Sequence, residues 1–377
     1  ERRTTMSKKT LMVLAVLAVV LAAAVWKSGK TASGPVAENA GDSQPLLNGV
    51  DIGTVSAIEI QEGSSTTHLE KAESGWCVAE QENAPADFNR LRDMMRSLDE
   101  MKRGQVAEAG DAHLAEYGLA EGGEAAPLKI TLKHGTGTTV LSLGKMRESQ
   151  RGEGYWGPPR GRYARVDNGP VLLLKEDVRM AQAGSDLWWE RSLIALPPES
   201  VQKIKVQAEA ESVVLERGTN GVITLAGAGD GESVNMEAAN RLFGALRSLR
   251  ADKIVPVATD VGDAFAKAAS FQADVEGAVY RIQLGAALPD SGDARPIRIE
   301  TEVLSGATPE QQAVAAGVAK KVKGRTFLIP AYLADSLTPK RSELIQPPEP
   351  EPEPTPAPEE TPVPPPVPVV DPADPEG

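Results

Sequence analysis

The stretch that decides the fold is Val55–Ile60 (VSAIEI), in which apolar and polar residues alternate as in a half-buried β-strand. The same pattern returns 146 residues later at Val201–Val206 (VQKIKV). At the same offset, His68–Lys71 (HLEK) is echoed by Val214–Arg217 (VLER). Gly63–Ser65 provides a turn between the first two segments, which predicts a β-hairpin. We therefore expect one β-rich structural unit to occur twice in this chain.

An amphipathic helix is repeated in the same order. Asn89–Leu91 and Arg96–Leu98 recur, with identical internal spacing, as Asn240–Leu242 and Arg247–Leu249, 151 residues later. The recurring arginines and serines fall between the apolar positions, so we expect them on the exposed face and attribute their recurrence to duplication rather than to a site.

The ends of both helices are marked in the sequence. Pro85 and Asp87 start the first helix and Gly104 ends it, whereas Asn235 is the expected N-cap of the second. Residues at three- and four-residue spacing form one apolar stripe on each helix. The first stripe is Phe88, Leu91, Met95 and Leu98, flanked by Met94 and Met101; the second is Ala239, Leu242, Phe243, Leu246 and Leu249.

Further strands are expected after each helix. They are Leu128–Lys133, Thr138–Leu143 and Tyr163–Val166 in the first copy, and Phe271–Glu276, Val279–Leu284 and Thr326–Ile329 in the second; Leu172–Val178 and Ala331–Leu337 then follow as short segments. The predicted fold class is α+β: two tandem copies of a strand–helix–strand unit, each with an antiparallel sheet covered on one face by its helix. The expected boundaries are residues 50–197 and 198–345.

Residues 1–26 resemble a membrane anchor. Basic residues precede an uncharged run, Leu11–Trp26, which as a helix would span about 24 Å at ~1.5 Å per residue. The basic flank places the N-terminus in the cytoplasm. Trp26 and Lys27 favour a retained anchor, whereas Ala22–Ala24 leaves a cleaved secretory signal as the alternative. Residues 27–49 are small and polar, as expected of a flexible spacer.

Residues 346–377 form a proline-rich tail. From Pro347 onward the chain has fourteen prolines and eight Asp or Glu in 31 residues, without Lys or Arg. Such a composition predicts disordered, extended polyproline II chain with a reach of about 95 Å at ~3.1 Å per residue. We expect it to be a spacer or to recruit a partner.

Several function classes are disfavoured. The net charge of −13 argues against nucleic acid as a partner. The histidines His68, His113 and His134 lack ligand spacing, so we expect no metal site, and the glycine clusters are typical of turns rather than phosphate loops. No catalytic triad or cofactor motif is present in the sequence, although a pair of carboxylates placed by the fold remains open. The oligomeric state is not predicted.

Two aromatic segments are candidates for contact with a partner protein. Trp188 and Trp189, with Arg191, end the first copy, and we expect one indole in the core and the other over the junction between the copies. A structural hinge and a docking patch are both compatible with this segment. Tyr155 and Trp156 lie in a loop rich in Gly and Pro without a clear counterpart in the second copy.

The chain resembles the bacterial family DUF4340 over most of residues 6–345. The resemblance rests on the anchor, Val55–Ile60, Gly75-Trp76, Ala86–Leu91, Tyr117–Leu119, Leu143–Lys145 and Trp189–Leu193, in this order. The second copy departs from the pattern, with Ala269–Phe271 where Tyr117–Leu119 would stand. The resemblance implies a single-pass inner-membrane protein with most of its chain in the periplasm, often encoded beside ABC-type transport and gliding components. It supplies no catalytic residues.

The leading hypothesis is a non-enzymatic, membrane-tethered periplasmic accessory protein that binds a partner of an ABC-type envelope transport system. The alternatives are an envelope hydrolase with a cleft between the two units, and a structural spacer. We expect function to reside where the first unit has what the second lacks.

Overall fold

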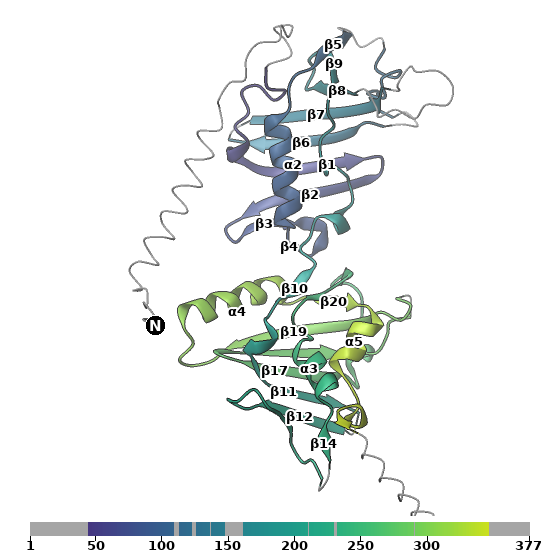
Figure 1. The fold of residues 1–377 in the computed structure, drawn as a ribbon. Coiled ribbons are helices and arrows are strands. Elements are labelled where there is room, and N and C mark those ends of the chain that lie inside the picture. Colours follow the sequence, from purple (N-terminus) through teal and green to yellow (C-terminus); the bar gives the residue numbers. More distant parts are fainter. Residues whose placement is uncertain are drawn as a thin grey trace, which may run out of the picture. The chain divides into compact units, whose positions relative to one another are not determined.

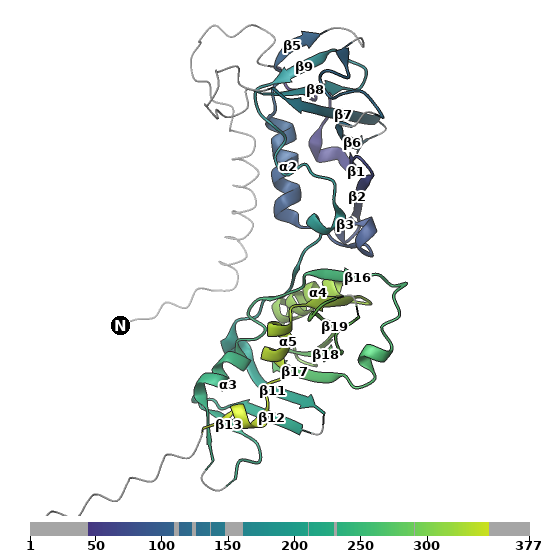
Figure 2. The same cartoon turned by 90° about the vertical axis from the view of Figure 1, so that its right-hand side faces the viewer.

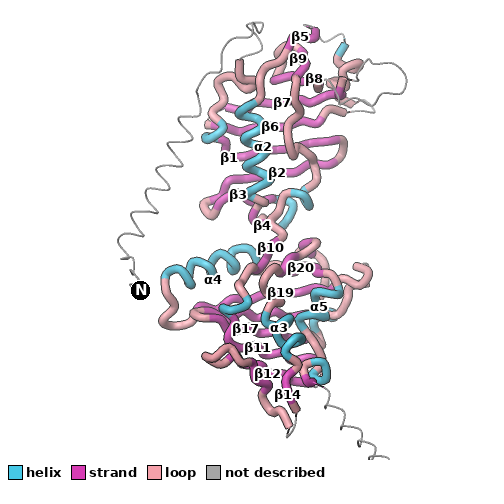
Figure 3. The backbone as a smooth tube through the Cα atoms, in the orientation of Figure 1, coloured by secondary structure: helices cyan, strands magenta, loops and turns pink. Residues whose placement is uncertain are grey.

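The computed structural model describes residues 44–108, 113–122, 126–135, 137–147, 161–209, 211–229, 232–289 and 291–346. The chain divides into two compact units, Glu1–Glu190 and Arg191–Gly377, here called the first unit and the second unit. Strands dominate both of them (Figure 3). The division falls before the predicted boundary at 197/198, because Ser192–Ile194 already pairs with Leu249–Arg250 of the second unit.

The first unit is built on one antiparallel sheet (Figure 1). Among the described residues this sheet has nine strands, in the order β4-β3-β2-β1-β6-β7-β8-β9-β5. Their bounds are β1 (Val55–Glu62), β2 (Ser65–Ala72), β3 (Gly75–Val78), β4 (Ala84–Pro85), β5 (Gln105–Glu108), β6 (Leu128–His134), β7 (Gly137–Met146), β8 (Arg162–Val166) and β9 (Val171–Leu174).

One face of this sheet is apolar and is covered by the helix α2 (Phe88–Glu100), as Figure 2 shows. Alternate strand residues, among them Ile58, Ile60, Leu69, Ile130, Leu132 and Leu141, are almost completely buried. The Asp87 carboxylate caps the helix by accepting the N–H groups of Asn89 and Arg90. The predicted helix and its start at Asp87 are confirmed, whereas the predicted end at Gly104 is wrong, because α2 ends at Glu100 with Met101 as its C-cap. The stripe is shifted, because Leu91, Met94 and Leu98 are the buried helix residues while Phe88 is 66% exposed.

The second unit has a sheet of eight strands among the described residues, in the order β13-β12-β11-β17-β18-β19-β20-β16, with two short strand pairs beside it. The bounds are β10 (Ser192–Ile194), β11 (Val201–Ala208), β12 (Glu211–Arg217), β13 (Ile223–Leu225), β14 (Ser233–Val234), β15 (Leu249–Arg250), β16 (Lys253–Val255), β17 (Ala269–Val275), β18 (Ala278–Leu284), β19 (Arg295–Val303), β20 (Thr326–Ile329) and β21 (Ile345–Gln346). β10 pairs with β15, and β14 with β21.

In the described part of this unit three α-helices accompany the sheet: α3 (Met236–Phe243), α4 (Pro309–Val322) and α5 (Ala331–Leu337). Figure 2 shows α3 and α5 on one face of it. The side chain of Asn235 caps α3, as predicted, and every residue of the predicted apolar stripe is buried. The predicted helix is too long, however, because Leu246 lies beyond α3 and Leu249 begins β15. The α+β class with antiparallel sheets is therefore confirmed for both units.

Apart from β4, which has no counterpart in the second sheet, the two sheets have the same strand order. β11, β12 and β13 take the places of β1, β2 and β3, and β17 to β20 take those of β6 to β9, with β16 in the place of β5. Even an irregularity is repeated: the register shifts between Val55 and Ala57 in β1, and between Val201 and Lys203 in β11. This comparison corrects one predicted equivalence, because Thr326–Ile329 (β20) occupies the position of β9 rather than that of Tyr163–Val166 (β8).

Among the described residues, α4 is a clear difference between the units. In the first unit a turn joins β8 to β9, whereas in the second unit α4 stands between the equivalent strands β19 and β20. Thr308 and Gln311 form a capping box at its start, with Pro309 at the first helical position. This helix was not predicted. Function should therefore also be sought where the second unit has what the first lacks.

Some predictions concern segments beyond the described residues. The expected anchor, residues 11–26, and the tail from residue 347 lie outside them, and within the described part no helix is long and apolar enough to cross a membrane. Residues 44–49 belong to the first unit rather than to the spacer, because Leu46 is buried and its N–H donates to the carbonyl of Met101 at 2.8 Å.

The core of the second unit contains an ionisable group, the phenol of Tyr280 on β18, which is 1% exposed. Burial raises the pKa of Tyr280 above its usual value. Its contribution to stability is therefore fully present below about pH 10, the pKa of an unfolded tyrosine, and is lost as the pH rises from there through the raised folded pKa. We expect Tyr280→Phe to remove this part of the alkaline destabilisation, which amounts to at most about 1.4 kcal/mol per pH unit.

Urea denaturation between pH 8 and pH 11 measures the effect, with Tyr332→Phe as the control because Tyr332 is 70% exposed. Identical pH profiles for Tyr280→Phe and the unmodified chain would contradict the expectation.

Candidate binding pocket of the second unit

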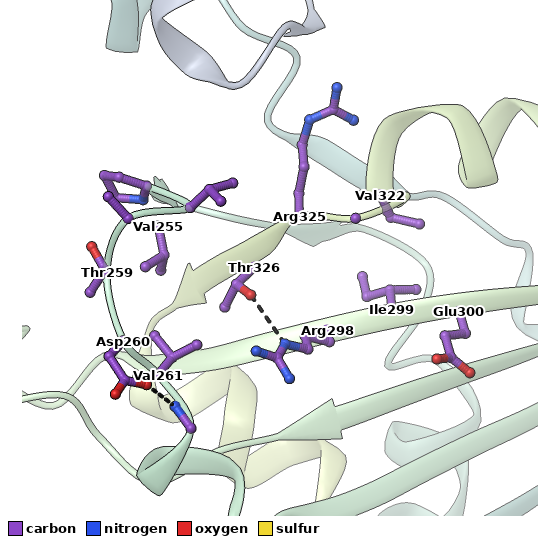
Figure 4. A pocket seen from close by; sticks show the side chains of 15 residues that line it. Val255, Thr259, Asp260, Val261, Arg298, Ile299, Glu300, Val322, Arg325 and Thr326 are labelled. Carbon is purple, nitrogen blue, oxygen red and sulfur yellow. Dashed lines mark hydrogen bonds between the residues drawn. The ribbon is translucent and has the colours of Figure 1, made fainter.

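A pocket of about 680 Å³ lies in the second unit. Figure 4 shows its walls: the loop Val255–Gly262 after β16, the segment Arg298–Glu300 of β19, and the turn Val322–Thr326 that leads from α4 into β20. The last of these walls exists only because α4 is present. The pocket therefore belongs to the part of the second unit that differs from the first.

The strand pairing explains why the edge of the sheet leaves room for a pocket at this place. β20 pairs with β19 only through Arg295–Ile297, while β18 pairs with β19 as far as Val303. Beyond Ile297 the sheet thus lacks both β20 and β16 on this side, and the chain entering β20 comes from α4. Gly324 makes this entry with a φ of +72°, a left-handed conformation that favours glycine.

The pocket loop is fixed by its own hydrogen bonds. The Asp260 carboxylate accepts the Gly262 N–H at 2.9 Å, and the Thr259 N–H donates to the Pro256 carbonyl at 2.9 Å. Val257, between these turns, is 73% exposed. The loop therefore exposes the Val257 side chain on a backbone that is held by hydrogen bonds within the loop.

The next segment, around Ala264, is held by a contact that both units share. In the second unit the Ala286 N–H donates to Ala264 O at 2.7 Å, and in the first the Lys145 N–H donates to Tyr117 O at 2.8 Å. Ala264 thus occupies the place of Tyr117. The predicted substitution of Ala269–Phe271 for the tyrosine segment is wrong, because Ala269 begins β17.

A glycine permits this approach in each unit, and an arginine completes it. Gly144 and Gly285 precede the two donating residues, and their carbonyls accept the Nε–H of Arg162 and of Arg295, each at 2.9 Å. We call this arrangement the glycine–arginine clasp. In the second unit it holds the chain that continues from the pocket loop.

Arg298 is the central polar group of the pocket. Its Nε–H donates to Thr326 Oγ1 at 3.2 Å, and its guanidinium carbon lies 4.2 Å from the centroid of the Phe265 ring. Figure 4 shows the guanidinium between β20 and the pocket loop. A planar guanidinium held by stacking and by one hydrogen bond is suited to bind carboxylate or phosphate groups, because little side-chain entropy remains to be lost.

A basic run borders the same wall. Residues 319–325, with the sequence AKKVKGR, contain four basic residues in seven. Arg325 donates through Nη1 to the carbonyls of Lys320 and Lys321, at 3.2 and 3.0 Å, and so satisfies carbonyls at the end of α4. Positive charge at a helix C-terminus is also favoured by the helix dipole. The run therefore stabilises α4, and it makes this rim of the pocket basic.

Two carboxylates also line the pocket, Asp260 and Glu300. Asp260 is engaged within its own loop, and Glu300 stands farther along β19 in Figure 4. Among the described residues no group of three or more His, Cys, Asp or Glu is placed to hold a metal ion. The arrangement is suited to binding an acidic ligand with an apolar portion.

The predicted aromatic contact residues lie elsewhere. Trp188 and Trp189 are 0% and 1% exposed, and the Trp188 indole N–H donates to Gln182 O at 2.9 Å. Neither ring offers a surface to a partner, which corrects the prediction of a docking patch at these two positions. Arg191 is half-buried, and its carbonyl accepts the Ala251 N–H at 3.0 Å. Tyr155 and Trp156 lie outside the described residues.

Arg90, expected on an exposed helix face, is in contact with the segment that carries these tryptophans. It donates through Nη2 to Met180 O and to Gln182 Oε1, each at 3.1 Å, and stacks on Trp188 at 4.8 Å. Burial lowers the pKa of the Arg90 guanidinium, and nearby Asp87 acts in the opposite direction. In the first unit this recurring arginine therefore fixes the segment Met180–Trp188, at the end of the unit.

The pocket residues had signals in the sequence. Thr308-Pro309-Glu310-Gln311 is a helix-start signature, and AKKVKGR is a basic run in an acidic chain. Together they indicate a helix with a basic C-terminus. Arg298 has no such signal, since its importance comes from its contacts with Phe265 and Thr326.

These observations define an α+β protein with two antiparallel-sheet units and a basic, partly apolar pocket in the second. The chain matches the family described as a domain of unknown function, DUF4340, over residues 76–272, just over half of its length. It belongs to the DUF4340 family. Comparison with curated proteins and with solved structures gave no match.

Proposed function

We propose that this protein is a non-catalytic accessory protein, anchored in the bacterial inner membrane by residues 11–26 with its two units in the periplasm. In this proposal it binds a partner belonging to an ABC-type envelope transport system. The apolar run behind a basic flank supports the anchor, and the resemblance to DUF4340 supports the setting.

The observation that carries a binding role is the position of Arg298. Its guanidinium is stacked on Phe265 and bonded to Thr326 in a pocket with both polar and apolar lining residues. A fixed arginine of this kind is a frequent centre of binding energy in protein interfaces. One wall of the pocket, the turn from α4 into β20, has no counterpart in the first unit, as is usual for a function added to a scaffold.

We also infer that the two units are tandem copies of one ancestral unit. The common strand order, the shared register shift and the glycine–arginine clasp support this inference. Duplication explains why one unit can acquire α4 and the pocket while the other keeps the original connection between its strands.

The binding proposal is tested by recovering the full chain, with an affinity tag, from native membranes. We expect permease or ATPase subunits of an ABC-type system to be recovered with it. Arg298→Ala should lower their recovery about tenfold or more, because truncating an arginine at the centre of an interface typically costs about 2 kcal/mol or more.

Arg241→Ala is the matched control, since Arg241 is an exposed arginine of α3 outside the pocket. Its recovery of partners should equal that of the unmodified chain. Equal recovery with Arg298→Ala, or recovery of the protein without transport subunits, would overturn the proposal.

A further inference from the structure

We infer that the pocket of the second unit is a docking site for the chain's own acidic tail, residues 347–377. The inference rests on the proposed function only in taking this pocket as the binding surface. It adds a regulatory element, because a tail in the pocket competes with any external partner for the same arginine.

Charge complementarity is the first argument. The tail contains eight Asp or Glu and no Lys or Arg. The pocket presents Arg298 and Arg325, and the exposed Lys320 and Lys323 adjoin the same wall, whereas the Lys321 ammonium donates to the Ser192 carbonyl at 2.9 Å. These basic residues outnumber the two carboxylates that line the pocket, and the Asp260 carboxylate already accepts a backbone N–H. An acidic segment therefore has a favourable electrostatic partner on its own unit.

Apolar complementarity is the second argument. Between its acidic portions the tail has an uncharged stretch, Val363–Val370 (VPPPVPVV). Val255, Val257, Val261 and Val322 line the pocket, and Val257 is 73% exposed. Proline-rich segments bind shallow apolar grooves at low entropic cost, because their backbone is already restricted. Since Val255, Val261 and Val322 are buried, Val257 is the valine that the sequence VPPPVPVV can contact, while flanking carboxylates reach the guanidinium groups.

Tethering is the third argument. The tail follows β21, which pairs with β14 of the second unit, so it starts on the unit that carries the pocket. Its 31 residues can reach about 95 Å at ~3.1 Å per residue, whereas a folded unit of this size has a radius of gyration of about 15 Å. Tethering makes docking an intramolecular event, with an effective concentration that depends on the length and stiffness of the tail. Weaker contacts are therefore sufficient than for a separate molecule.

The test uses the full chain in native membranes, with the photoreactive substitution Val257→p-benzoylphenylalanine. Irradiation followed by peptide mass spectrometry should give intramolecular adducts on residues 347–377. Val222→p-benzoylphenylalanine is the matched control, because Val222 is 50% exposed in the second unit but does not line the pocket. We expect at least fivefold more tail adduct from position 257 than from position 222.

Two further variants separate docking from random encounter. Replacing the eight tail carboxylates by amides, which keeps its length, should reduce the adduct from position 257 to the control yield, and so should Arg298→Ala. Equal yields from positions 257 and 222, unchanged yields in these variants, or adducts only to another protein or to lipid would overturn the inference.

The outcome is distinguishable from that of the proposed function. Loss of transport subunits with Arg298→Ala, without any tail adduct, would leave the binding proposal intact and remove the docked tail. A tail adduct that depends on Arg298, without co-purified subunits, would do the reverse.

Discussion

Replacing Trp188 by alanine is expected to destabilise the first unit by about 3–5 kcal/mol, the range found when a large buried aromatic side chain is removed. The indole is fully buried, donates to Gln182 O at 2.9 Å and lies under the guanidinium of Arg90. The substitution removes the packed ring and the hydrogen bond, and it leaves Arg90 without its stacking partner. Since a folded domain is stable by about 5–15 kcal/mol, much of the first unit's stability would be lost.

Urea denaturation followed by circular dichroism measures this effect. The matched control is Phe88→Ala on α2, since Phe88 is 66% exposed and its removal should change the free energy of unfolding by less than about 0.5 kcal/mol. A Trp188→Ala midpoint equal to that of the control would show that the indole does not support the fold.

The burial of both tryptophans shows where reasoning from sequence reaches its limit. The side chains of adjacent residues point to opposite sides only where the backbone is regularly extended, as in a β-strand. Here Trp188 has φ −108° and ψ −12°, a helical conformation at the end of a 3-10 turn, whereas Trp189 forms an extended bridge with Ala86. The backbone changes direction between them, so both indoles can be buried. Nothing in the residue types alone predicts that change.

The strands and α3 were predictable for the opposite reason. Alternation in β1, β2, β6 and β7, and the stripe of α3, arise from burial of one face of a regular element, and periodicity reports that directly. α4 buries only Ala315, Val318 and Val322, so its apolar face is too narrow to stand out in the sequence. Its capping box was the better signal. The pocket was not predicted either, because one of its walls depends on α4.

The second large effect is expected at the glycine–arginine clasp. In Gly144→Ala the new Cβ would lie 2.1 Å from Tyr117 O, and in Gly285→Ala it would lie 2.9 Å from Ala264 O. The backbone around Tyr117 O or Ala264 O cannot move aside as a flexible side chain can. Each substitution therefore pushes the end of the strand away from this backbone segment. We expect a loss of about 3 kcal/mol or more for Gly144→Ala and about 1–2 kcal/mol for Gly285→Ala, as for other overpacked sites. Urea denaturation of each variant provides the measurement.

The control is Gly317→Ala in the interior of α4, where a Cβ meets nothing within 4 Å. Alanine is favoured over glycine in a helix by about 1 kcal/mol, so this variant should be more stable than the unmodified chain. The same chemical change thus has opposite expected signs at the clasp and in α4. An unchanged free energy of unfolding in Gly144→Ala would mean that the clasp can relax. The recurrence of the clasp in both units would then no longer support duplication. Destabilisation at both Gly144 and Gly285 would mean that the two units depend on the same contact, although only the second has α4 and the pocket.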